Sequence, residues 1–128
     1  MTSFHVDQFL PHAPEKVWRH ITDADRVTRW WAEATEIKPI VGHTFTIDMG
    51  EWGKQPCEVL EVVEPERFVY SFTERWTLIW TLAPEGDGTR LFLEHAGFDL
   101  DDPQDQFAFE NMGIGWRDRV FPHLAETV

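Results

Sequence analysis

The chain has little of the chemistry that holds small proteins together covalently or through metals. Cys57 is its single cysteine, so no disulfide can form within the chain. No second cysteine or histidine lies at metal-site spacing around it, and the histidines other than His95 are scattered: His5, His12, His20, His43 and His123. We therefore expect no bound metal and no cofactor. We expect Cys57 to be an unreactive buried thiol in a protein of the reducing cytoplasm.

Basic residues are also scarce, with 11 Lys and Arg against 23 Asp and Glu and a formal net charge of −12. Nucleic acids and anionic membranes bind to basic patches, so neither is an expected partner. No stretch approaches the roughly 18 uninterrupted apolar residues that a membrane span needs. The first residues lack the basic and apolar segments of a secretory signal, which favours a cytoplasmic location.

Tyrosine occurs once, whereas the chain has seven Trp and ten Phe. Each aromatic side chain can bury about 150–250 Å². In 128 residues, a length typical of one domain, so many rings must either fill a large core or line a hollow one. Composition does not choose between these alternatives. We expect residues 1–128 to form a single domain.

The first thirty residues predict one strand and two short helices. Residues 4–10 are typical of a strand, and Pro14 suits the first turn of a helix over residues 15–22. A second short helix ends in the pair Trp30-Trp31. Helices this short are marginal alone, so we expect them to dock on something larger.

The hydrophobic period then changes from helical to alternating. Alternating or continuous apolar patterns predict strands over residues 43–49, 57–63, 67–73, 76–82 and 91–95. The segments joining them are short, which favours an antiparallel meander.

The last part of the chain predicts a long helix over residues 104–127. Its apolar stripe consists of Phe109, Met112, Trp116, Val120 and Leu124. Pro122 should kink this helix. Gly113 and Gly115 either leave space beside a cavity or allow close packing on the sheet, and the pattern leaves both open. Together these elements predict an α+β fold, in which a curved antiparallel sheet of about six strands wraps around the C-terminal helix.

Several motifs follow one another through nearly the whole chain. They are residues 14–18 (PEKVW) before Trp30-Trp31, residues 57–72 (CEVLEVVEPERFVYSF), residues 88–98 (GTRLFLEHAGF) and the GW pair at 115–116. They resemble the START-like (SRPBCC) superfamily of birch-pollen-allergen-like helix-grip proteins. Within it, they are similar to the branch named after the activator of the heat-shock-protein-90 ATPase, in particular to that protein's C-terminal domain.

This resemblance implies a cavity between the sheet and the C-terminal helix that binds a hydrophobic small molecule: a lipid, a polyketide or an aromatic compound. Together with the aromatic residues, it predicts the following ligand-binding residues: Trp30, Phe45, Trp52, Phe72, Trp80, Leu93, His95, Phe109, Met112 and Trp116. A solid aromatic core is the alternative that the sequence leaves open.

Two polar residues bear on whether the protein is an enzyme. His95 shares the inward face of its strand with Leu93, either as a polar group at the cavity or as a structural residue at the bend near Gly97. Glu61 is either a general acid in a dry cavity or a solvent-facing residue on the outer side of the sheet.

No catalytic set is assembled, so the sequence favours a non-catalytic binder. One alternative is a cyclase, dehydratase or hydrolase acting on a polyketide-like substrate, which some members of the superfamily are. The other is a co-chaperone-like protein-interaction module that uses Trp30-Trp31 and Trp52.

Overall fold

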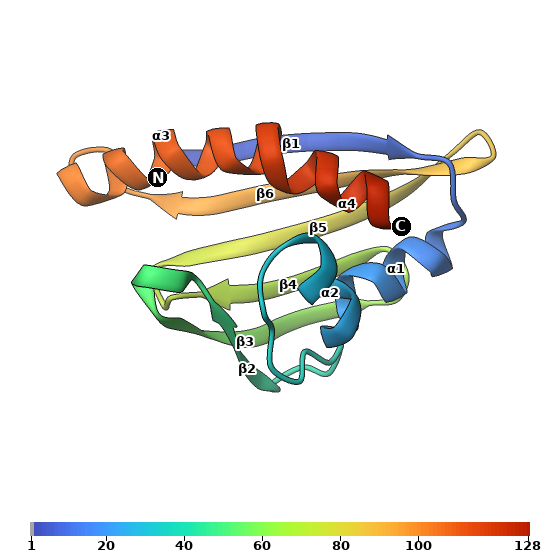
Figure 1. Cartoon of the computed structure of the whole chain (residues 1–128), viewed down its shortest axis with the longest axis horizontal. Helices are drawn as coiled ribbons and strands as arrows, with labels where there is room; N and C mark the ends of the chain where they lie inside the picture. Colours follow the sequence, from blue (N-terminus) through green and yellow to red (C-terminus); the bar gives the residue numbers. More distant parts are fainter. Residues whose placement is uncertain (1) are drawn as a thin grey trace.

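The fold is built on a six-stranded antiparallel sheet with the order β1-β6-β5-β4-β3-β2. The computed structural model describes residues 2–128 (Figure 1). The sheet strands are β1 (Thr2–Leu10), β2 (Thr44–Asp48), β3 (Lys54–Val63), β4 (Arg67–Phe72), β5 (Trp76–Glu85) and β6 (Gly88–Phe98). The remaining elements are α1 (Pro14–Thr22), α2 (Ala24–Trp30), the single turn η1 (Gly50–Trp52), α3 (Pro103–Gly115), the π-turn η2 (Trp116–Val120) and α4 (Phe121–Thr127).

This arrangement confirms the predicted α+β helix-grip fold and the order of its elements. The alternation predicted for the fifth strand is present in β5, where Leu78, Trp80 and Leu82 are buried and the residues between them are only partly so. Across the ladder, Trp80 lies opposite Leu93 and Leu82 opposite Leu91. The inner face is therefore apolar on both central strands, which fixes their register.

The C-terminal helix runs along β1 and β6 (Figure 1). It begins where the Asp102 carboxylate accepts a hydrogen bond from the amide of Gln104. The helix departs from regular α geometry just before Pro122, where a kink was predicted. There the amide of Phe121 donates to the carbonyl of Trp116, five residues back, and so forms the π-turn.

Because of the π-turn, one residue of the predicted apolar stripe, Val120, is wrong. Val120 is only partly buried, whereas Phe121 is 1% exposed and belongs to the core. A π-turn places one extra residue in the helical ladder, so the inward face moves on by about one position. Regular helical spacing from Trp116 therefore predicts Val120 as the buried residue, whereas the structure buries its neighbour Phe121.

Trp80 lies at the centre of the packed half of the molecule and is fully buried. Its ring contacts Trp30 of α2, Trp116 of η2 and Phe121 of α4, at centroid distances of 5.7, 5.8 and 5.9 Å. Its indole N–H donates to the hydroxyl of Tyr70 at 3.1 Å. One strand residue thus joins three helical elements to the sheet.

The two glycines of the C-terminal helix have different surroundings. A Cβ on Gly113 would lie 2.6 Å from the ring of Phe4 in β1, whereas a Cβ on Gly115 would meet nothing closer than 4.0 Å. Gly113 therefore permits close packing of the helix on the sheet, and Gly115 has no such role.

We expect Gly113→Ala to lower the free energy of unfolding and Gly115→Ala to raise it by up to about 1 kcal/mol, the helix-propensity difference between the two residues. In the first variant, the clash with Phe4 outweighs the same gain in propensity. Urea denaturation of both variants and the parent tests this order. Equal stabilisation by both substitutions would contradict it.

His20 ties α1 to the end of the chain. It is 3% exposed, and its Nε2 contacts the hydroxyl of Thr127 at 2.9 Å, while its carbonyl accepts from the indole of Trp30 at 3.0 Å. Burial, helped by the nearby Arg26 and Arg29, lowers the pKa of His20 to about 4. The folded protein therefore holds this imidazole neutral where the unfolded chain, with a pKa near 6.5, takes up a proton.

Stability should accordingly fall as the pH drops below 6.5, by roughly 2 kcal/mol between pH 7 and 5 for this histidine alone. We expect His20→Gln to remove that part of the pH dependence. His5→Gln, at an exposed position of β1, should leave it unchanged. Urea denaturation at the two pH values measures the difference, and an unchanged loss in His20→Gln would refute the assignment.

Candidate functional site

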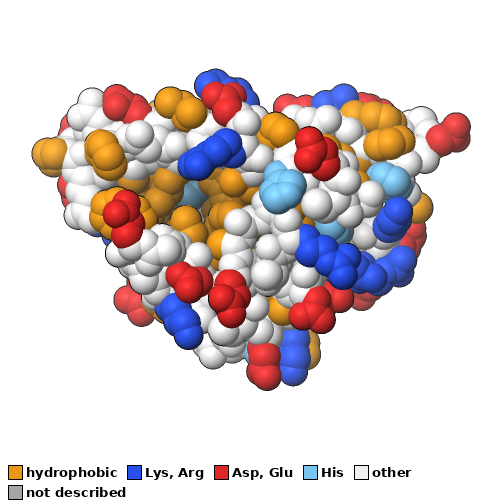
Figure 2. All heavy atoms as spheres, in the orientation of Figure 1, with side chains coloured by type: hydrophobic (Ala, Val, Ile, Leu, Met, Phe, Trp, Pro, Cys, Tyr) orange, Lys and Arg blue, Asp and Glu red, His pale blue; other side chains and the backbone are white. Residues whose placement is uncertain are grey.

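The C-terminal helix covers only part of the inner face of the sheet. Its α3 segment makes its main sheet contacts with β1 and β6, and packs less extensively against the end of the sheet where β4 turns into β5. A recess of about 340 Å³ lies there. It is lined by Met49, Trp52, Gln55, Phe72, Thr73, Arg75, Trp76, Gln104, Phe107, Ala108, Asn111 and Met112. Figure 2 shows hydrophobic atoms gathered in a hollow of this side of the molecule.

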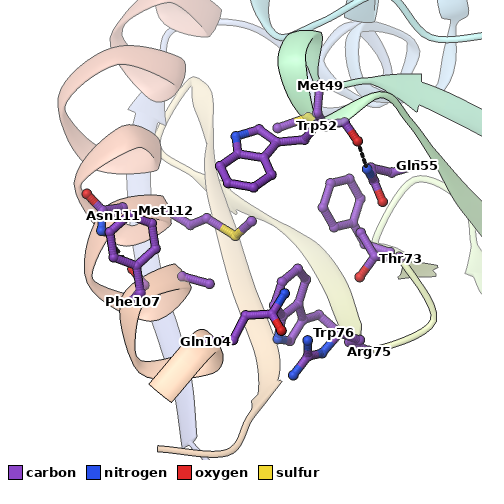
Figure 3. Close-up of a pocket in the computed structure, with 12 residues that line it drawn as sticks. Met49, Trp52, Gln55, Thr73, Arg75, Trp76, Gln104, Phe107, Asn111 and Met112 are labelled. Carbon is purple, nitrogen blue, oxygen red and sulfur yellow. Dashed lines mark hydrogen bonds between the residues drawn. The ribbon is translucent and has the colours of Figure 1, made fainter. Parts of the chain in front are cut away.

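Three parts of the chain form the walls of the recess (Figure 3). Met112 extends from α3 toward Trp52, which follows β2 in the single turn η1. The carbonyl of Trp52 accepts from the side-chain amide of Gln55 at 2.7 Å, which fixes this turn against β3. Trp76 and Phe72 come from the two sides of the β4–β5 turn, with their rings stacked at 6.3 Å. The walls are therefore mostly apolar, with amide groups at the edge.

The β4–β5 turn has an uncommon backbone. Thr73 and Glu74 have φ values of 63° and 68°, in the left-handed region that β-branched residues such as threonine rarely adopt. The amide of Thr73 donates to the carbonyl of Pro56 at 3.0 Å, which holds the turn against β3. Thr73 lines the recess, and its hydroxyl is buried and has no hydrogen-bond partner among residues 2–128.

His95 lies beneath the recess, in contact with Phe72 and Trp76 at centroid distances of 6.1 and 5.6 Å. It is 1% exposed, and burial lowers its pKa to about 3, so the ring is neutral. The indole of Trp116 donates to its Nδ1 at 3.0 Å. An indole nitrogen can only donate, so Nδ1 is the unprotonated nitrogen and Nε2 carries the hydrogen.

Charges gather at one edge of the recess. The guanidinium of Arg75 lies 2.6 Å from the buried carboxylate of Asp105 and 3.2 Å from that of Asp102. It also lies 5.6 Å from the centre of the Trp76 ring. Asp105 in turn accepts from the amide of Asp99 at 2.9 Å. Arg75 is therefore already neutralised by carboxylates of this chain.

The predicted ligand-binding residues fall into two groups. Trp52, Phe72 and Met112 line the recess. The others lie outside its lining: Trp30, Phe45, Trp80, Leu93 and Trp116 in the buried core, His95 under the floor, and Phe109 between Phe4 and Phe98. A role in ligand binding stays a prediction for all of them.

Sequence reasoning missed Trp76, Thr73, Gln104 and Phe107 as lining residues. Trp76 could have been found, since it shares the inward face of β5 with Leu78 and Trp80. Phe107 lies off the apolar stripe of its helix and is 60% exposed, so periodicity gave no signal for it.

The carboxylate of Glu61 and the thiol of Cys57 are not part of the recess lining. Glu61 pairs with Arg67 on the neighbouring strand, and about half of its side chain is exposed. Cys57 is buried, and burial raises the pKa of its thiol to about 12, which makes it unreactive at neutral pH. Within residues 2–128, no three His, Cys, Asp or Glu side chains are grouped so that they could hold a metal ion. In the same range, no helix is long and apolar enough to cross a membrane.

Solved structures similar to this chain support the same fold. Protein MLL2253 of Mesorhizobium loti is 29% identical, with a TM-score of 0.87 over 98% of this chain and 96% of that one. Protein BH1534 of Bacillus halodurans is 23% identical, with a TM-score of 0.85 over 100% and 97%. DynU16, a protein in the dynemicin biosynthetic locus, is 21% identical, with a TM-score of 0.78 over 97% of this chain and 46% of its own. At 23% and 21% identity, the last two structures support only the fold of this chain.

No match was found among curated proteins. The family model described as "Activator of Hsp90 ATPase homolog 1-like protein" matches residues 11–128, nearly the whole chain. The match agrees with the motifs in the sequence and with the helix-grip architecture. The chain therefore belongs to the activator of Hsp90 ATPase homolog 1-like family of the START-like superfamily.

Proposed function

We propose that the recess binds a hydrophobic small molecule, a lipid, polyketide or aromatic compound, without transforming it. The observation that carries this proposal is a recess of about 340 Å³ with Trp52, Phe72, Trp76 and Met112 in its walls. That volume is in the range of small-molecule sites, which are mostly apolar with a few polar groups to orient the ligand. We also propose that the protein is cytoplasmic, because its single cysteine cannot form a disulfide within the chain.

The polar groups around the recess support binding rather than turnover. In the part of the chain that the structure describes, the lining contains no carboxylate, histidine or thiol, and its charged residue, Arg75, is paired with Asp102 and Asp105. His95 lies outside the lining, and its low pKa makes it a poor base. Glu61, the other acid–base candidate of the sequence, is paired with Arg67.

A carboxylate placed in the apolar wall should abolish binding. We expect Met112→Asp to weaken binding of the neutral fluorescent probe N-phenyl-1-naphthylamine at least tenfold, because the complex would bury a charge that has no partner. Ile114→Asp on the same helix is the matched control. Ile114 is 53% exposed and lies outside the recess, so this variant should bind the probe like the parent.

Probe fluorescence measures the affinity, and circular dichroism confirms that both variants are folded. Equal binding by the parent and the Met112→Asp variant would place the probe outside the recess. That result would refute the proposed site.

A further inference from the structure

Two buried N–H groups, one in the floor of the recess and one beneath it, lack an acceptor. The indole Nε1–H of Trp76 and the Nε2–H of His95 have no hydrogen-bond partner among residues 2–128. Trp76 is 7% exposed and lines the recess, and His95 is 1% exposed and in ring contact with it. Buried donors are nearly always paired in folded proteins, so two adjacent exceptions call for a physical explanation.

Neither ring can easily turn away to find an acceptor elsewhere. Trp76 is packed against Phe72, Phe98 and His95, and the guanidinium of Arg75 lies over it. His95 is held in its orientation by the hydrogen bond from Trp116. Both donors are therefore fixed in place before any ligand arrives, as in preorganised binding sites.

The buried hydroxyl of Thr73 belongs to the same corner, in the β4–β5 turn that precedes Trp76. Threonine at a φ of 63° is unfavourable, and glycine or asparagine would fit the turn at lower cost. Strained residues of this kind often occur at binding sites. The turn thus holds a third unpaired polar atom against the recess.

The charges around this corner favour a neutral ligand. Among residues 2–128, Arg75 is the one cation in the lining, and two carboxylates already neutralise it. His95 is uncharged, and the whole chain carries a formal net charge of −12. A ligand carboxylate would meet no free positive charge here, whereas a neutral oxygen acceptor would satisfy an unpaired donor without any charge being buried.

We propose, building on the small-molecule binding proposed above, that the recess selects neutral apolar molecules that carry a carbonyl oxygen, and that Trp76 donates a hydrogen bond to that oxygen. Thr73 lies in the same corner, and His95 packs against the Trp76 ring from beneath the recess. The aromatic walls hold the apolar body of the ligand, and this corner sets its orientation.

Three probes with one carbon skeleton test the proposal: diphenylmethane, benzophenone and 4-benzoylbenzoate. They offer no acceptor, a neutral carbonyl, and the same carbonyl with a carboxylate. We expect benzophenone to bind about tenfold more tightly than diphenylmethane and more tightly than 4-benzoylbenzoate. In ¹⁵N-labelled protein, benzophenone should shift the indole N–H resonance of Trp76 strongly downfield, and diphenylmethane should not.

Variants separate the hydrogen bond from the packing. In Trp76→Phe the ratio of benzophenone to diphenylmethane affinity should fall toward one, because an apolar ring remains and the donor is lost. Trp52→Phe is the matched control, since its indole lies at the rim and is 69% exposed. It should preserve the ratio even if both affinities change. Thr73→Val, which has the same shape without the hydroxyl, should reduce the ratio less than Trp76→Phe.

The outcomes distinguish this inference from the function on which it rests. If none of the three probes perturbs the recess, the proposed function fails and the inference with it. If benzophenone and diphenylmethane bind equally, the recess is a hydrophobic site but does not select carbonyls, and the inference alone is overturned. If 4-benzoylbenzoate binds most tightly, the site selects anions, which also overturns it.

Discussion

The contacts of Trp80 are the interaction on which the rest of the structure depends. Its ring is the point where α2, η2 and α4 meet the sheet, through Trp30, Trp116 and Phe121. Edge-to-face and stacked aromatic contacts are each worth about 0.5–1.5 kcal/mol beyond the area they bury. The hydrogen bond to Tyr70 satisfies the indole N–H, so this cluster can be fully dry. The helices therefore pack on the sheet at this end through buried aromatic side chains.

The position of the recess follows from where the C-terminal helix packs on the sheet. The π-turn places Trp116 so that its ring contacts Trp80 while its indole N–H reaches His95, and thereby joins the aromatic cluster around Trp80 to the histidine beneath the recess. Beyond that point α3 lies over β1 and β6, with Gly113 close against Phe4, and the recess lies between α3 and the β4–β5 turn. Packing at Trp80 and Gly113 thus determines where the helix covers the sheet and where the hollow remains.

The sequence was sufficient to predict the fold and three residues that line the recess, Trp52, Phe72 and Met112. Alternation in the strands and the apolar stripe of the last helix reflect burial on one face, which any regular element must show. Periodicity could not reveal the π-turn, because one extra residue moves the inward position from Val120 to Phe121 without changing the composition. Periodicity also could not distinguish aromatic residues packed in the core from those that line the recess. Trp80 and Trp76 share one face of β5, and what covers each of them is decided by a helix far away in the sequence.

The two tryptophans on this face of β5 differ in the hydrogen bonding of their indole N–H groups. Trp80 and Trp76 both bury an indole, yet the N–H of the first is paired with Tyr70 and that of the second is unpaired at the recess. If position 76 served packing alone, phenylalanine would fill most of the space and bring no donor that must be desolvated. The unpaired N–H makes Trp76 less favourable in the empty protein than a tryptophan whose N–H is paired. In the proposal above, Trp80 stabilises the fold at one end of the strand and Trp76 orients a ligand at the other.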